Sequence, residues 1–328
     1  MIQSRVDLMT PVAVEALARA GCREVWLGAE SGSQKVLDAM DKGTRVEQIP
    51  VVRRRLRDAG IANINLDLIA GLAGQTFASW DESVTALLDA GVPHASMYML
   101  EVDEDSRLGR EMLAGGARYY AETVPCDDAI AQMYTRAIER LGQAGLAQYE
   151  ISNFCRPGFA SHHNLRYWQR RPYLGLGLDA SSMLRTALRA ADQSESGNVL
   201  RSTTTSDLAE FLAGTAPVET AWLSPARQHE EAWFLGLRLN RGVDVAAVEC
   251  EFGCELTSQA LEAVARLTTD GLLDSDGKIV RLTARGQLLS NDVFQEFLEL
   301  EAGEPRSDTQ LHDPPFSHQS PVPERARL

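Results

Sequence analysis

The sequence predicts an α/β fold, with a parallel sheet in its first half and a small helical module near its end. Two observations lead to this prediction. Helix-like and strand-like segments alternate from residue 11 to about residue 100, and helix-like segments surround a short hairpin in the last third. The chain has 328 residues, of which 44% are hydrophobic, so it can bury a substantial core.

The alternation can be followed segment by segment. The helix-like segments are 11–22, 46–60 and 79–91, and the strand-like segments are 23–31, 61–72 and 94–100. Gly21, Gly60 and Gly91 follow the three helices, where a left-handed residue commonly ends a helix before the next strand. A further helix over 128–144 leads into another predicted strand within 143–154.

The composition changes in the last third of the chain. Residues 185–228 are rich in Ser, Thr and small residues, and within them "DQSESGN" and "TTTSD" predict a connection and surface turns. After a boundary near residue 220, three helices, a hairpin and a final helix are predicted, and "DSDGK" is a strong turn signal for that hairpin. We therefore expect a main domain over 1–220, a winged-helix-like domain over 221–301 and a disordered tail over 302–328.

Charge and cysteine content exclude several classes of protein. The net charge of −14 and the pI near 4.9 argue against a nucleic-acid-binding protein, which needs a basic face. No apolar run has the length of a membrane span and the amino terminus does not resemble a signal peptide, so a cytoplasmic protein is expected. The odd number and irregular spacing of the thiols argue against a disulfide framework; they are Cys22, Cys126, Cys155, Cys250 and Cys254.

Polar residues and glycines follow two neighbouring predicted strands. "LGAESGS" ends the first, and "LDLIAGLAGQT" repeats the arrangement one unit later, with Asp67 inside an apolar strand. The carboxyl ends of parallel strands form the edge at which α/β folds bind ligands. Asp67 is therefore a candidate ligand-binding carboxylate, and the alternative is a purely structural carboxylate that buffers or caps buried groups.

Three motifs carry a resemblance to a known family. "YEISNF", "HHNLRYW" and "YLGLG" stand in that order, and longer similar segments cover nearly the whole chain except its tail. The chain resembles the oxygen-independent coproporphyrinogen III oxidase-like proteins, which are radical S-adenosylmethionine (SAM) proteins of the HemN and HemW type. The resemblance implies a partial (β/α)6 barrel, a C-terminal accessory domain, and SAM with a [4Fe-4S] cluster at the barrel mouth.

The cluster implied by the family needs three thiolates in a C-x3-C-x2-C motif, and this chain does not contain that motif. Cys250 and Cys254 supply only two thiols, which we expect on one helix face as cysteines of the core. No metal ligand is therefore predicted. We expect the chain to begin at the family's third strand, which would leave an unpaired sheet edge and favour self-association.

The SAM-contacting positions of the family can be transferred one at a time. The family's carboxylate at the end of the third strand corresponds to Gln3, which departs from the pattern. Its glutamine after the fourth strand corresponds to Glu30, and its arginine in the next helix corresponds to Lys42. Asp67 keeps the family's residue. The resemblance thus implies a SAM site at Glu30, Lys42 and Asp67, in which Glu30 and Lys42 depart from the family's residues, as Gln3 does beside them.

The stretch "ISNFCRPGFASHHNLRYW" admits two interpretations. His163, Asn164, Tyr167 and Trp168 are candidates for binding haem or a porphyrin, because imidazole ligates haem iron and aromatic rings stack on the macrocycle. In the alternative, His163 and Asn164 bridge backbone groups while the two aromatic residues fill the junction between the domains. The preceding Cys155 and His162 are expected to be incidental.

Three functions compete at this point. The first is a haem chaperone of the HemW type, which hands haem to a recipient protein, and we favour it because the "HNLRYW" element is complete and the accessory region is compact. The second is the oxidase, which decarboxylates coproporphyrinogen III propionates oxidatively through a 5'-deoxyadenosyl radical. The third is an inactive fragment. Catalytic residues are unknown, and whether the chain is an enzyme is left open.

Overall fold

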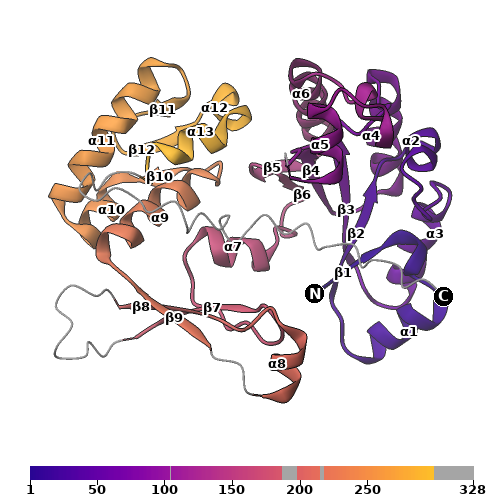
Figure 1. Cartoon of the computed structure of the whole chain (residues 1–328), viewed down its shortest axis with the longest axis horizontal. Helices are drawn as coiled ribbons and strands as arrows, with labels where there is room; N and C mark the ends of the chain where they lie inside the picture. Colours follow the sequence, from indigo (N-terminus) through magenta and orange to yellow (C-terminus); the bar gives the residue numbers. More distant parts are fainter. Residues whose placement is uncertain (104, 187–197, 215–217, 299–328) are drawn as a thin grey trace.

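A computed structural model describes residues 1–103, 105–186, 198–214 and 218–298, so the tail predicted over 302–328 lies outside them. The first half of the chain forms a six-stranded sheet in the order β1-β2-β3-β4-β6-β5 (Figure 1). The strands are β1 (Ile2–Arg5), β2 (Glu24–Glu30), β3 (Asn63–Ala70), β4 (His94–Met99), β5 (Ala147–Glu150) and β6 (Asn153–Cys155). The first four strands are parallel, as predicted.

The last two strands of this sheet differ from the expectation. One continuous strand was expected within 143–154, but Ile151 and Ser152 turn the chain back between β5 and β6. Strand β6 runs antiparallel to β4, and β5 runs antiparallel to β6. The strand is interrupted because the side chain of Ile151 packs into a second core, which is described below.

Helices connect the strands, and the predicted alternation is confirmed. They are α1 (Pro11–Arg19), α2 (Gln34–Ala39), α3 (Gln48–Asp58), α4 (Phe77–Ala90), α5 (Arg107–Leu113) and α6 (Asp127–Gln143), with 3₁₀ turns η1 (Val6–Leu8) and η2 (Arg118–Thr123). Helix α4 begins with a reciprocal capping box between Thr76 and Ser79 and ends at Gly91 in a left-handed conformation. These signals explain why its two boundaries could be predicted closely.

The two faces of the sheet have different chemistry, because alternate residues of a strand point to opposite sides. One face packs against α1, α3, α4 and α6 and is aliphatic; its strand residues include Val25, Leu27, Ala29, Ile64, Leu66, Leu68, Ala95 and Met97. The opposite face, called here the polar face, carries Glu24, Trp26, Glu30, Asn65, Asp67, His94 and Ser96. The candidate SAM-binding residues therefore lie on the polar face or beside it.

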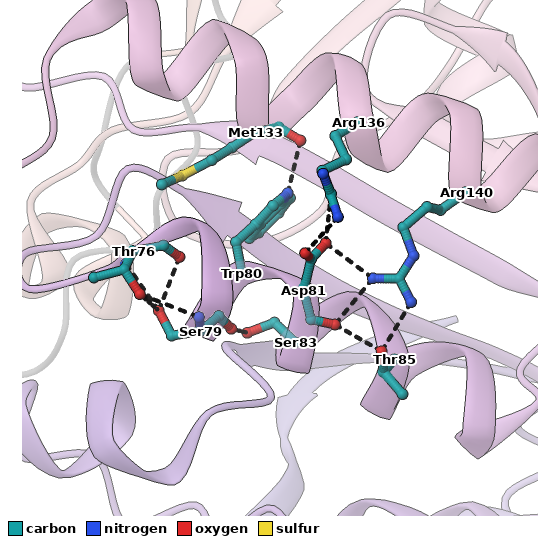
Figure 2. Close-up of polar contacts among 9 residues, drawn as sticks. All are labelled: Thr76, Ser79, Trp80, Asp81, Ser83, Thr85, Met133, Arg136 and Arg140. Atoms are coloured by element: carbon teal, nitrogen blue, oxygen red, sulfur yellow. Dashed lines mark hydrogen bonds and ion pairs between the residues drawn. The ribbon is translucent and has the colours of Figure 1, made fainter.

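Helices α4 and α6 are joined by polar contacts on the aliphatic side of the sheet (Figure 2). The indole nitrogen of Trp80 donates to the carbonyl of Met133 over 2.6 Å, and both side chains are buried. Asp81 accepts from Arg136 and Arg140 of α6 over 2.7 and 3.2 Å. Because α4 is fixed in this way, it provides a firm support for the loop that follows β2.

A small second sheet follows helix α7 (His162–Trp168). It consists of β7 (Ser181–Arg185), β8 (Val199–Thr203) and β9 (Glu219–Leu223), all antiparallel, with α8 (Leu208–Ala213) before β9. The sequence did not predict these strands; "TTTSD" follows β8 as the expected turn, and "DQSESGN" lies outside the described residues except for Asn198. Ser and Thr are common in these strands, and many of the side chains are only half-buried. The strands therefore lack the apolar alternation that would have predicted them.

The C-terminal region has the predicted arrangement of three helices, a hairpin and further helical turns. It contains α9 (Pro225–Leu237), β10 (Val243–Asp244), α10 (Val245–Phe252), α11 (Cys254–Thr269), β11 (Leu273–Ser275), β12 (Ile279–Leu282), α12 (Ala284–Leu288) and α13 (Ser290–Gln295). Strands β11 and β12 pair across the predicted turn. Gly253, with φ 89°, separates α10 from α11, so Cys250 and Cys254 lie on two helices and not on one helix face as expected.

The C-terminal region contacts the first sheet directly. Ile151, between β5 and β6, joins the core formed by Trp233, Val264 and their neighbours, and its amide donates to the carbonyl of Arg238 over 3.1 Å. Figure 1 shows α7 between these two parts of the molecule. No helix in the described ranges is long and apolar enough to cross a bilayer.

Candidate functional site

The carboxyl ends of β2 and β3 bring the three candidate SAM-binding residues together. Lys42 donates to Oε1 of Glu30 over 2.7 Å, and both side chains are largely buried. Oε2 of Glu30 is buried and has no hydrogen-bond partner among the described residues. A buried carboxylate oxygen is costly to leave unpaired, so this atom is suited to accept a hydrogen bond from a ligand.

The loop after Glu30 is fixed to α4. Ser83 of α4 accepts from the amide of Gly32 over 2.9 Å and lies 3.0 Å from the hydroxyl of Ser31. A Cβ added at Gly32 would lie 2.7 Å from Cβ of Ala86, so only glycine permits this close approach. The loop therefore holds Glu30, whose φ is 62°, in a defined place at the sheet edge.

Asp67 lies on the polar face beside Glu30. Its strand neighbour Gly28 has no side chain, and Oε1 of Glu30 lies 3.8 Å from the position a Cβ of Gly28 would occupy. Burial raises the pKa of Asp67 to about 6; hydrogen bonds from Ser96 and Asn65 oppose this rise, and the charge of Glu30 adds to it. Asp67 thus changes its charge in the weakly acidic range.

Gln3 lies farther from this group than the family correspondence implies. It pairs with Trp26 in the register between β1 and β2, whereas Arg5 pairs with Gly28 and is level with Asp67. Gln3 is also exposed. The structure therefore brings Glu30, Lys42 and Asp67 together and leaves Gln3 two residues away along its strand.

A line of buried hydrogen bonds leads away from Asp67 across the polar face. Asn65 donates to Asp67, and its carbonyl oxygen lies 2.6 Å from Nδ1 of His94. Nε2 of His94 lies 2.9 Å from the hydroxyl of Tyr149, which accepts from the amide of Ser161 over 3.1 Å. The line thus ends at the residue that precedes helix α7.

A branch of this network reaches the C-terminal region. The hydroxyl of Ser96 donates to Asn153 over 2.7 Å, and Asn153 donates to Glu150, which is fully buried. Burial raises the pKa of Glu150, and the nearby Arg238 opposes that rise. The guanidinium of Arg238 in turn lies 4.3 Å from the ring centre of Trp168, so one buried cation contacts both the sheet and α7.

The four candidate haem-binding residues on α7 divide into two pairs. His163 and Tyr167 are one turn apart and meet edge to face at 4.9 Å between ring centres. Tyr167 meets Tyr173 in the same way at 4.7 Å, which extends the row by a residue that the motif did not indicate. His163 is exposed, and partial burial lowers its pKa, which favours the neutral imidazole. His163, Tyr167 and Tyr173 are called the aromatic row below.

The other pair supports the helix. Trp168 is 8% exposed and packs with Leu235 and Leu239 of the C-terminal region. The backbone amide of Asn164 donates to the hydroxyl of Ser161, which caps the first turn of α7. These contacts match the structural interpretation for Trp168, and Tyr167 also packs against this cluster, whereas His163 is exposed.

The two candidate sites lie at opposite ends of β2. Glu30 is the last residue of this strand, whereas His163 responds to the charges of Glu24, its first residue, and of the amino terminus. Seven residues of strand separate the two ends by roughly 20 Å, at about 3.3 Å per residue. One small ligand therefore does not reach both sites.

The cysteines are distributed over separate elements. Cys155 lies in β6 and is buried, Cys22 is half-buried, and the other three are exposed. The expectation that Cys250 and Cys254 belong to the core was therefore wrong. Within the residues that the structure describes, no three His, Cys, Asp or Glu side chains gather as a metal site would require. The side chains described here thus do not form a ligand set for an iron–sulfur cluster.

Sequence analysis missed most of the buried network. Asn65, His94 and Tyr149 were not singled out, nor were Glu150 and Arg238. A usable signal was present, since the alternation in "NINLDLIA" places Asn65 and Asp67 on the same face of one strand. The partners from other strands depend on register, which the sequence alone did not provide.

Comparison with known proteins identifies the family. The model for the HemN C-terminal domain matches residues 223–289. Proteins named heme chaperone HemW are similar over most of the chain: the one from Lactococcus lactis is 30% identical over 285 residues, which cover 87% of this chain and 71% of that protein. The Bacillus subtilis protein of the same name is 28% identical over 299 residues, covering 90% and 75%.

A third relative and one solved structure are also similar to this chain. Heme chaperone HemW from Mycobacterium tuberculosis is 33% identical over 281 residues, which cover 85% of this chain and 66% of that protein. Coproporphyrinogen III oxidase (HemN) from Escherichia coli has the same fold, with a TM-score of 0.71 at 17% identity over 90% of this chain and 68% of that one. The chain belongs to the HemN/HemW family of radical SAM proteins.

Proposed function

We propose that this protein is a haem chaperone of the HemW type, which binds haem at the aromatic row and passes it to a recipient protein. The observation that carries the proposal is the row of His163, Tyr167 and Tyr173, in which the imidazole is exposed and the two phenol rings are half-buried, in a chain whose relatives are named heme chaperones. Haem is the cargo in this proposal, and the recipient is a second protein of haem metabolism.

The chemistry of the aromatic row suits haem. A neutral imidazole ligates haem iron, and the lowered pKa of His163 keeps its ring neutral at physiological pH. Tyrosine rings offer apolar area to the macrocycle and keep a polar end in water. The exposed imidazole of His163 also suits transfer, because a recipient can reach a ligand that is held at the surface.

The residues at the carboxyl ends of β2 and β3 fit SAM. Glu30 keeps a buried oxygen unpaired, Lys42 balances its charge, and Asp67 keeps a partly accessible carboxylate beside them. We propose that these three residues hold the polar groups of SAM, which supplies a sulfonium centre when bound. The scattered thiols do not fit the [4Fe-4S] cluster, so no radical step is derived for this chain.

The oxidase is the alternative within the same family. It requires a cluster-bound SAM next to the porphyrinogen, whereas the aromatic row belongs to α7, which begins beside Tyr149 and His94 at the start of β4, and Glu30 ends the parallel strand β2. This separation favours carriage of haem over its chemical conversion at the SAM end. The proposed place of action is the cytoplasm, in keeping with five cysteines that form no disulfide.

Haem titration of the full chain tests the proposal. We expect a Soret shift on binding and a dissociation constant that rises roughly tenfold in His163→Ala, which corresponds to about 1.4 kcal/mol. His162→Ala is the matched control, since His162 is adjacent and also exposed but stands outside the row. Equal spectra and affinities for the two variants would remove His163 as a ligand.

A further inference from the structure

The hydrogen bonds from Asp67 to Ser161 form one unbroken line between the two candidate sites. Its members come from β3, β4, β5 and the residue before α7, so three strands of the sheet contribute to the line. Asn65 and His94 are 1% exposed and Ser161 is fully buried, whereas Asp67 and Tyr149 are half-buried, so water is excluded from the centre of the line.

The donors and acceptors of this line have a single consistent order. The Asp67 carboxylate only accepts, so Asn65 donates its amide N–H there and offers its oxygen to His94. Nδ1 of His94 therefore carries the proton, and Nε2 accepts from the hydroxyl of Tyr149. The Tyr149 oxygen remains free to accept from the amide of Ser161. All four donors thus point toward Asp67.

The surroundings agree with this order. Burial lowers the pKa of His94 to about 4, so the ring is neutral and has one donor and one acceptor, as the line requires. Trp26 packs against the same ring at 5.1 Å and holds it in place. At the far end, Ser161 Oγ caps α7 through the amide of Asn164, so a shift of Ser161 moves the first turn of that helix.

We infer that Tyr149 and His94 are positioning residues for the aromatic row, and that they couple α7 to the charge on Asp67 at the SAM end of the sheet. The part of this inference that concerns haem rests on the proposed function. A carboxylate strengthens the hydrogen bond it accepts, and each donor in an aligned line polarises the next. Neutralising or occupying Asp67 therefore weakens the last link, between Tyr149 and Ser161.

A double-mutant cycle on the full chain tests this coupling. Tyr149→Phe keeps the ring and removes the last hydroxyl, and Asp67→Asn keeps the shape and removes the charge. Tyr134→Phe is the matched control, because its buried hydroxyl donates to the carbonyl of Ile151 beside the same strands but stands outside the line. His94→Gln interrupts the line one link earlier, in case Tyr149→Phe is poorly folded.

The first readout does not need haem. Amide hydrogen exchange at fixed pH is measured in peptides that cover residues 161–168. We expect Tyr149→Phe and Asp67→Asn each to speed exchange at the start of α7, and the double variant to exchange no faster than Tyr149→Phe alone. Asp67→Asn combined with Tyr134→Phe should instead give the product of the single effects. Independent effects of Asp67→Asn and Tyr149→Phe would overturn the inference.

The second readout is haem affinity in the same variants. Tyr149→Phe should raise the dissociation constant about fivefold, which corresponds to ~1 kcal/mol, and Asp67→Asn should add nothing to it. If hydrogen exchange in the variants is coupled but the unaltered protein does not bind haem, the proposed function is refuted and the coupling is retained. If haem binding depends on His163 but the effects of Tyr149→Phe and Asp67→Asn are additive, the proposed function is retained and the coupling is refuted.

Discussion

The two faces of the six-stranded sheet are built from the same strands by opposite means. In β3, the even-numbered residues from Ile64 to Ala70 face the helices and are all apolar and buried. Asn65 and Asp67, between them, face the other side and are tied into hydrogen bonds with β4 and β5. One face is held by burial of apolar area and the other by directed polar contacts.

The difference shows where this protein departs from maximal stability. Apolar residues on the polar face would avoid the cost of desolvating Asp67, His94 and Glu150, whose pKa values are all shifted by burial. Buried polar networks of this kind fix a unique geometry when every member is paired. The aliphatic face therefore serves the fold, and the polar face connects the sites proposed above.

The largest loss of stability is expected from a substitution on the aliphatic face. Leu66→Ala should lower the free energy of unfolding by about 2–5 kcal/mol, because Leu66 is 1% exposed and its loss leaves a cavity. Urea denaturation at pH 7 measures the change. Haem affinity of the folded fraction should stay the same, and a large loss of that affinity would contradict the division between the faces.

A smaller effect is expected on the polar face. Ser96→Ala removes the donor to Asn153, both residues being buried, and should lower the free energy of unfolding by about 1–3 kcal/mol. The same urea experiment provides the measurement. A cost as large as that of Leu66→Ala would mean that the polar face is also essential to the core.

The smallest effect is a change in pH dependence. The pKa of Asp67 rises from 3.8 to about 6 on folding, so its contribution to stability is present below pH 4 and is lost as the pH rises through 6. The pKa of His94 falls from 6.5 to about 4, so its contribution has the opposite slope over nearly the same range. The two slopes partly cancel in the unaltered protein.

Asp67→Asn removes the contribution of Asp67 to the pH dependence of stability and leaves that of His94. The variant should be more stable at pH 7 by on the order of 1 kcal/mol and should lose stability more steeply than the unaltered protein between pH 6.5 and 4.5. Urea denaturation at several pH values, compared between the two proteins, provides the measurement. Parallel curves would show that Asp67 does not titrate in this range.

The sequence predicted the parts of the fold that local signals determine. Helix α4 illustrates this, since its capping residues and Gly91 mark both ends. The second sheet was missed because β7, β8 and β9 are short, polar and antiparallel without tight turns between them. The break between β5 and β6 was missed because it depends on Ile151 reaching another core, which is a tertiary effect.

The candidate site could be predicted only in part for a similar reason. Glu30, Lys42 and Asp67 were indicated by family correspondence, and the structure places Glu30 and Lys42 in an ion pair with Asp67 beside them. His94 and Tyr149 stand 55 residues apart in the chain, and only strand register brings them within 2.9 Å. Their importance follows from geometry that no local pattern records.

The placement of Ile151 has a consequence for the order of assembly. The core around Trp233 needs this side chain, which is supplied by a turn at the edge of the first sheet. During synthesis the C-terminal helices emerge last, and they can complete their core only on a sheet that has already formed. The C-terminal region produced alone should therefore stay loosely packed. The whole chain should unfold in one cooperative step.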